Sequence, residues 1–222
     1  KQKNRNMSNK LAKAENTALS VNAFSANIDS NDIDIPRINV VQKTSDIYGP
    51  DGEPAPYGSL VIDKTYILAK PEEDVRCIPL IASKAWREEI PFDSDEVPRI
   101  ANSDEERKDL ERDSDYKFIE FAEITLLFKG GHIDPEMFPL PIGKDYYAIG
   151  RINTAKDAYR QTFKRLYTFA TFNPKTPLHT REWNFKSTLI SRGKYSWYAP
   201  MLSVSSDDSS QDVVDFVEGF LV

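Results

Sequence analysis

The stretch Arg181-Glu182-Trp183-Asn184-Phe185-Lys186-Ser187-Thr188-Leu189 is followed, beyond Ser191-Arg192-Gly193, by Lys194-Tyr195-Ser196-Trp197-Tyr198-Ala199. In both stretches aromatic and β-branched residues are interspersed with polar ones, a pattern typical of strands that are buried on one side. A glycine that ends a short polar segment between two such runs indicates a tight turn. The sequence therefore predicts a β-hairpin.

The two faces of this hairpin differ in chemistry, because side chains alternate between the faces of a strand. On the first strand Arg181, Trp183 and Phe185 share one face, while Asn184 and Lys186 share the other. On the second strand Tyr195 and Trp197 share one face. We expect one face to be core and the opposite face to offer three side chains to a ligand: Lys186, Lys194 and Tyr198.

One substantial helix is predicted directly upstream, over residues 155–170. Thr154 and Asp157 have the spacing of a capping box. Apolar residues recur at helical spacing and form one stripe: Ala155, Ala158, Tyr159, Phe163, Leu166, Tyr167 and Ala170. A basic ridge borders that stripe and consists of Lys156, Arg160 and Lys164. We expect the stripe to pack on a sheet.

Further strands are predicted over residues 58–62, 64–69, 74–82 and 116–128, which are apolar runs bounded by turn residues. Pro79 favours an edge strand or a bulge, because proline has no N–H to donate to a sheet. The fold class is therefore mainly β (α+β).

Composition divides the chain into three parts. Residues 1–34 are polar and predict a flexible N-terminal arm, and residues 35–203 predict a single β domain. Within that domain residues 87–115 form an acidic insertion, with one exposed helix near Ser103–Arg112. Residues 204–222 form an acidic end with an apolar tip.

The net charge of −6, taken alone, argues against nucleic acid and membrane surfaces as partners. The charges are, however, separated along the chain. Residues 144–203 hold eleven Lys and Arg against three Asp and Glu, whereas residues 71–115 hold seven against fifteen and residues 204–222 hold none against five. Binding of nucleic acid is therefore not excluded, but it must be local to the basic block and compete with the protein's own acids.

The basic block also holds twelve aromatic residues. Cationic side chains follow phosphates, and flat rings accept unstacked bases, which is the chemistry of single-stranded nucleic acid binding. The alternative is structural, because aromatic residues in hairpins usually pack in the core. Our candidates for phosphate contacts are Lys156, Arg160, Lys164, Lys186, Arg192 and Lys194. The candidates for stacking are Trp183, Tyr195, Trp197 and Tyr198, of which alternation places about half in the core.

Two interpretations of residues 204–222 stay open. A polyanionic tail can occupy a basic groove until DNA displaces it, or can dock on partner proteins through Asp212, Asp215, Phe216 and Phe220. Alternatively, Val213, Val214, Val217, Phe220 and Leu221 fit one face of a short packed helix.

The residues offer little to an enzyme. The two histidines, His132 and His179, are not spaced as ligands with Cys77 or with acids, and no glycine-rich phosphate loop is present. Asp113, Asp115, Lys117, Glu120 and Glu123 supply the residue types of a metal-dependent nuclease but fit the solvated start of a strand. We therefore expect no catalytic activity, no metal and no cofactor.

The environment is expected to be reducing and cytosol-like. A single cysteine excludes an internal disulfide framework, and the longest apolar runs are too short to cross a bilayer. The first residues, Lys1–Met7, lack the apolar core of a signal peptide. We expect no membrane partner.

Three short segments resemble a group of bacteriophage proteins: Ile35-Pro36-Arg37-Ile38-Asn39-Val40-Val41-Gln42, the strand from Arg76-Cys77-Ile78-Pro79-Leu80 through Trp86-Arg87, and Gly193-Lys194-Tyr195-Ser196-Trp197-Tyr198-Ala199-Pro200. That group looks like phage single-stranded DNA-binding proteins with an OB-fold, a small Greek-key barrel that binds strands across one face. The resemblance covers about residues 35–203, and the acidic insertion departs from a simple barrel.

The resemblance implies an OB-like Greek-key barrel or sheet that coats single-stranded DNA without strong sequence preference in the cytoplasm of a bacterial host. Replication or recombination proteins and further copies of the chain would be its partners. The alternative function is a virion or assembly protein that clasps neighbouring subunits through its terminal arms.

Overall fold

The computed structural model describes residues 34–49, 51–91, 94–131 and 137–220, and all of these except Asp34 belong to one compact unit that begins at Ile35. Its elements run in the order β1 (Ile38–Val40), β2 (Leu60–Ile62), β3 (Tyr66–Ala69), β4 (Val75–Glu88), β5 (Ile100–Ala101), α1 (Asp104–Arg112), β6 (Phe118–Gly131), β7 (Leu140–Ile142), β8 (Asp145–Ala155), α2 (Lys156–Gln161), α3 (Phe163–Phe172), a 3₁₀ turn (Leu178–Thr180), β9 (Arg181–Arg192), β10 (Tyr195–Asp208) and α4 (Gln211–Phe220). The unit is mainly β with additional helices, as predicted.

Several predicted features lie outside the described residues. They are the N-terminal arm up to residue 33, His132, and Leu221 and Val222 at the apolar tip. Within the described ranges, no helix has the length and apolarity needed to cross a membrane.

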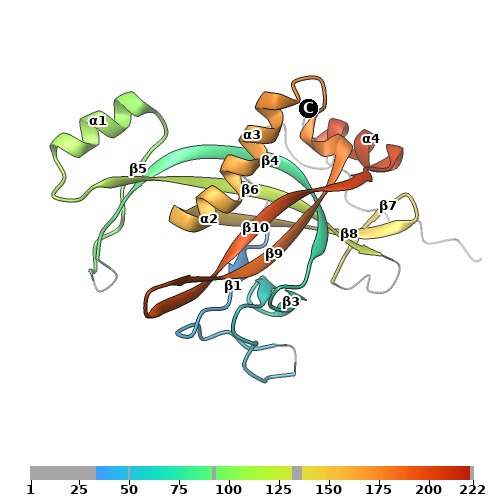
Figure 1. Ribbon diagram of the computed structural model, residues 1–222, viewed down its shortest axis with the longest axis horizontal. Coiled ribbons are helices and arrows are strands. Elements are labelled where there is room, and N and C mark those ends of the chain that lie inside the picture. The colour runs from blue at the N-terminus through green and yellow to red at the C-terminus, as the bar shows by residue number, and fades with distance from the viewer. Residues whose placement is uncertain (1–33, 50, 92–93, 132–136, 221–222) are drawn as a thin grey trace, which may run out of the picture. The chain divides into compact units, whose positions relative to one another are not determined.

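The strands form two antiparallel sheets. The small sheet has the order β1-β2-β3, and the main sheet has the order β10-β9-β4-β6-β8-β7, with β5 paired to β4 (Figure 1). The segment β9-β4-β6-β8 has the 4-1-2-3 order of a Greek key. Both sheets are open, so of the barrel and the sheet that the sequence allowed, the structure shows the sheet.

Alternating side chains of the main sheet build a separate core on each face. On one face Ile124, Leu126 and Phe128 of β6 pack with the small sheet and with α2 and α3. On the other face Leu127 of β6 and Ile78 of β4 pack against α4. The helices that follow β8 therefore lie on the opposite side of the sheet from the C-terminal helix.

Gly150 of β8 allows the small sheet to come close. A Cβ atom at this position would lie 2.8 Å from Ile38 Cδ1 and 3.1 Å from Ile62 Cδ1. The small sheet packs on the main sheet at this point because glycine leaves room for both isoleucines.

The predicted helix over residues 155–170 is two helices, with a break at Thr162. Thr162 is fully buried, and its hydroxyl donates to the carbonyl of Ala158 at 2.7 Å. Its backbone departs from helical geometry, with φ −118° and ψ −84°. A threonine that bonds back four residues bends a helix, and here it separates α2 from α3.

This break rotates the apolar stripe. Tyr159 and Leu166 are buried as predicted, but Tyr167 is 67% exposed. The prediction that Tyr167 packs on the sheet is therefore wrong.

Pro79 lies at a bulge. The pairing of β4 with β6 shifts register between Pro79 and Ile81. The bulge was one of the two alternatives that the sequence offered.

The acidic insertion contains β5 and α1, and α1 lies where the sequence predicts an exposed helix, near Ser103–Arg112. Ser103 accepts a hydrogen bond from the Glu106 backbone N–H at 3.1 Å, and α1 has no buried residues. Figure 1 shows α1 beyond the end of the paired strands β4 and β6.

Residues 204–220 are part of the folded unit. Strand β10 continues to Asp208, and α4 buries Val213 and Val217 against the second face of the sheet. Of the two interpretations of the acidic end, the packed helix is the one that the structure shows.

Candidate nucleic-acid interface

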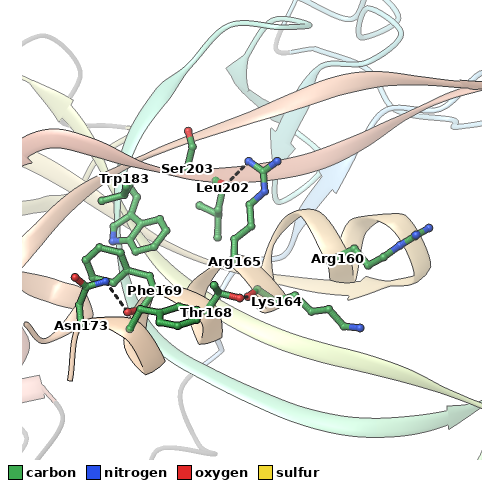
Figure 2. Close-up of a pocket in the computed structure, with 11 residues that line it drawn as sticks. Arg160, Lys164, Arg165, Thr168, Phe169, Asn173, Trp183, Leu202 and Ser203 are labelled. Atoms are coloured by element: carbon green, nitrogen blue, oxygen red, sulfur yellow. Dashed lines mark hydrogen bonds between the residues drawn. The ribbon is translucent and has the colours of Figure 1, made fainter.

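An open hollow of about 490 Å³ lies between α3 and the edge strand β10, and we call it the α3 groove (Figure 2). Its lining comes from α2, from α3 and the residue that follows it, and from β9 and β10: Arg160, Lys164, Arg165, Thr168, Phe169, Phe172, Asn173, Trp183, Leu202, Ser203 and Val204. Among these described residues are three cations and no carboxylate. The groove thus combines an apolar floor with a positively charged rim.

The three cations of the groove are held differently. Arg165 reaches across to β10 and donates to the carbonyl of Leu202 at 3.1 Å, so it joins the helix to the strand (Figure 2). Arg160 and Lys164 extend from the helices at the other end of the groove from Trp183, and their side chains are 55% and 53% exposed. Lys164 Nζ pairs with Glu120 at 3.8 Å, and it is the exposure of its side chain that leaves it accessible to an anion.

Trp183 lies under the groove and is 1% exposed. Its ring packs edge-on against Phe169 with centroids 5.2 Å apart, and its indole N–H donates to Leu178 O at 3.2 Å. Because both the ring and its polar atom are enclosed, Trp183 does not offer a stacking face. The prediction that Trp183 stacks on a base is therefore wrong.

The exposed rings of this region belong to α3. Phe172 is 79% exposed and lines the groove. Tyr167 ends a ladder of near-parallel rings, Tyr159, Phe163 and Tyr167, whose successive centroids lie 5.2 Å and 6.3 Å apart. None of Phe172, Tyr167 and Arg165 is among the contacts predicted from the sequence. Phe172 could have been identified from the sequence, because it is an aromatic residue of the basic block that lies just beyond the predicted helix and its apolar stripe.

The hairpin forms as predicted, but the residues of its two strands that share a face differ from the predicted ones. Strand register places Tyr198 opposite Leu189 and Leu202 opposite Phe185, so Tyr198 shares the core face with Phe185. Lys186 lies opposite Met201 and therefore shares the other face with Trp197, which is opposite Ile190. The expectation that Lys186 and Tyr198 lie on one face is wrong, because alternation within each strand leaves the register between strands undetermined.

Tyr198 is engaged by the loop that precedes β2. Its ring meets Tyr57 edge-on at 4.9 Å, and a Cβ atom at Gly58 would lie 2.6 Å from the Tyr198 ring. Gly58 has φ +93°, so the loop needs glycine for both its backbone and this contact. Tyr198 therefore packs against this loop, and only part of its surface is exposed.

The end of the hairpin carries exposed aromatic and basic side chains. Tyr195 is 64% exposed, and Lys194 Nζ lies 5.3 Å from its ring centroid. Trp197 is half-buried, with the Arg192 guanidinium 5.9 Å from its ring. These predicted contacts lie together.

Two other predicted phosphate contacts are tied to carboxylates elsewhere. Lys156 bonds Glu89, and Lys186 Nζ lies 3.8 Å from Glu72 Oε2. Lys186 also lies away from the groove lining. The structure therefore brings Arg160 together with Lys164 at the groove and with Arg192 at Asp157, whereas Lys186 lies at neither place.

A second hollow of about 370 Å³, which we call the α2 pocket, lies between β1, the start of α2 and β10. Its lining includes Asn39, Lys156, Asp157 and Trp197. Asp157 also bonds Arg160 of the α3 groove and Arg192 of the hairpin. The two hollows and the hairpin therefore meet at one carboxylate.

No protein-family model, curated protein or solved structure matches the chain.

The predicted partner-binding residues lie on α4. Asp212 and Asp215 are exposed, while Phe216 and Phe220 are half-buried and stack with centroids 6.2 Å apart. Because α4 covers the face opposite α2 and α3, it does not cover the α3 groove. The interpretation of residues 204–222 as a cover for a basic groove is corrected.

Proposed function

We propose that this protein binds single-stranded DNA along the α3 groove and the adjoining end of the β9–β10 hairpin. The observation that carries the proposal is the lining of the α3 groove, which joins three cations to an apolar floor and an exposed ring without a carboxylate. Phosphates of a strand would contact Arg160 and Lys164. An unstacked base would lie on Phe172, which is 79% exposed.

Single strands fit this surface better than duplexes. An apolar floor and a free ring are useful only to bases whose faces are accessible, and the bases of a duplex are stacked inside it. No arrangement of base-reading side chains is needed for such contacts, so binding would depend little on sequence. The Greek-key order of β9-β4-β6-β8 supports a relationship to OB-type proteins and, with it, a role in coating DNA during phage replication or recombination.

The test is binding of fluorescent oligonucleotides of about 16 nucleotides, single-stranded and duplex, over a range of salt concentrations. We expect the single strand to bind more tightly and the logarithm of its affinity to fall linearly with the logarithm of salt concentration. Replacing Arg160 and Lys164 together by Gln should reduce that slope by about 1.4, since each phosphate contact on a single strand contributes about 0.7.

Lys64 and Lys70, exposed lysines outside the groove lining, provide a matched control. Replacing both by Gln removes the same charge and should leave the slope nearly unchanged. Failure to bind single strands, or binding that does not depend on salt, would overturn the proposal and favour the assembly role. Equal affinity for RNA would widen the ligand class without moving the site.

A further inference from the structure

We propose that the α2 pocket holds one unstacked nucleobase of the bound strand, an inference that rests on the proposed function and adds a second kind of contact to it. The pocket volume of about 370 Å³ lies within the range of small-ligand sites. The pocket is bounded by β1, by the junction of β8 and α2, and by residues 197–200 of β10.

One residue of the lining, Asn39, carries an unused hydrogen-bond donor. Nδ2 of Asn39 is buried and has no hydrogen-bond partner among the described residues. The other amide of the wall is used, because Gln42 Nε2 donates to Tyr198 O at 2.8 Å. A buried amide donor without a partner is unfavourable unless a ligand or water accepts its hydrogen bond. Every nucleobase carries acceptors on its edges that an asparagine amide can bond.

A carboxylate of the lining holds two cations that would contact the phosphates on either side of such a base. Asp157 of the lining bonds Arg160 and Arg192, whose side chains are 55% and 59% exposed. Arg192 also lies over the ring of Trp197, which belongs to the lining. A strand held by these two arginines would pass beside the pocket, because both bond a residue of its lining.

Other occupants fit less well. A metal ion would find one carboxylate, Asp157, which already bonds two arginines. A peptide strand added to β10 would need free backbone groups, but Tyr198 O accepts from Gln42 and Pro200 has no N–H. A planar ligand with hydrogen-bond acceptors and an adjoining negative charge matches the pocket best.

The experiment measures binding of thymidine monophosphate by fluorescence and binding of a short oligonucleotide by anisotropy. Trp197 is the reporter, because Trp183 is buried in the core and Trp86 lies on β4. The mononucleotide should quench the fluorescence saturably. Asn39→Leu keeps the size of the side chain, removes the donor and changes no charge. It should weaken mononucleotide binding about tenfold and oligonucleotide binding about threefold, with the salt slope unchanged because no phosphate contact is lost.

Two further variants keep the result interpretable. Ala158→Leu partly fills the pocket from α2 and should have the same effect, while Asn102→Leu makes the same exchange at an exposed position in the acidic insertion and should have none. If the wild type binds oligonucleotides and both pocket variants bind them equally well, the pocket proposal is wrong and the function stands. If the wild type binds no oligonucleotide yet binds the mononucleotide at this pocket, the function is wrong and the pocket stands.

Discussion

Asp157 of α2 and Arg192 at the end of the hairpin are joined by a hydrogen bond of 2.6 Å across 35 residues of sequence. The carboxylate is largely enclosed, with 12% of its side chain exposed, and it also accepts from Arg160. Both arginines are more than half exposed. One carboxylate therefore holds two cations that a phosphate would otherwise contact, and any bound strand must compete with it.

Replacing Asp157 by Asn should tighten binding of single-stranded DNA about two- to thirtyfold, because it removes two ion pairs to exposed arginines, and such pairs contribute about 0.2–1 kcal/mol each. The salt dependence should also become steeper, since both arginines would then be free to release counterions from the DNA. Anisotropy titrations at several salt concentrations measure both quantities.

Asp109→Asn is the matched control, because Asp109 bonds Arg112 at 2.5 Å on the exposed helix α1. It makes the same change of charge away from both hollows and should leave affinity within error of the wild type. Weaker binding by Asp157→Asn would contradict the competition and show that positioning of the hairpin matters more.

Val217→Ala should lower the free energy of unfolding by about 1–3 kcal/mol, because its fully buried side chain packs on the second face of the sheet. Urea denaturation measures the change. Val97→Ala removes the same methyl groups from a side chain that is 85% exposed and should change stability little. A mobile C-terminal segment would give the two variants equal stability.

Helix α4 also shows what sequence periodicity can and cannot supply. The spacing of Val213 and Val217 predicts an amphipathic helix, but an apolar stripe carries no information about which surface covers it. Its docking site consists of residues such as Ile78 and Leu127, which share a face only after the pairing of β4 with β6 is known. The acidic composition of the segment pointed instead to a tail.

The candidate site likewise has features that the local sequence pattern predicts and features that it does not. Local pattern identified the hairpin and the basic ridge with Arg160 and Lys164, but it placed Tyr195, which is 64% exposed, on the face opposite the one expected to meet a ligand. It did not identify the register that separates Lys186 from Tyr198, which is fixed by the turn and by contacts distant in sequence. Nor did it show that Thr162 would break the helix, since that requires the buried hydroxyl to bond Ala158 O.

Glu88→Gln should weaken the attachment of the acidic insertion and remove part of the acid sensitivity of the fold. Hydrogen bonds from the Arg99 guanidinium, with further ones from Ser114 and the Arg99 backbone, lower the pKa of Glu88 from 4.5 to about 2. Because the folded pKa is the lower one, the native state binds fewer protons, and the stabilisation is present above about pH 4.5 and lost as pH falls toward about 2.

Urea midpoints between about pH 7 and about pH 3 test this expectation. The wild type should be the more stable at neutral pH, and the difference from Glu88→Gln should shrink as the pH falls below about 4.5. Glu105→Gln, at an exposed position of α1, is the control, and its urea midpoint should change with pH in the same way as that of the wild type. A difference that stays constant with pH would show that the Glu88 carboxylate is not the group responsible.

Phe172 offers a separate test of stacking at the α3 groove. Its ring is 79% exposed and therefore contributes little to the core, so Phe172→Ala should leave the unfolding midpoint close to that of the wild type. Binding of single-stranded DNA should weaken by about 1–3 kcal/mol if a base stacks on the ring. Phe172→Leu keeps apolar area but removes the flat face, and Phe172→Tyr keeps the face. Affinity should therefore fall with Leu nearly as far as with Ala and remain close to the wild type with Tyr, whereas a contact that depends on apolar area alone would make Leu the better substitute.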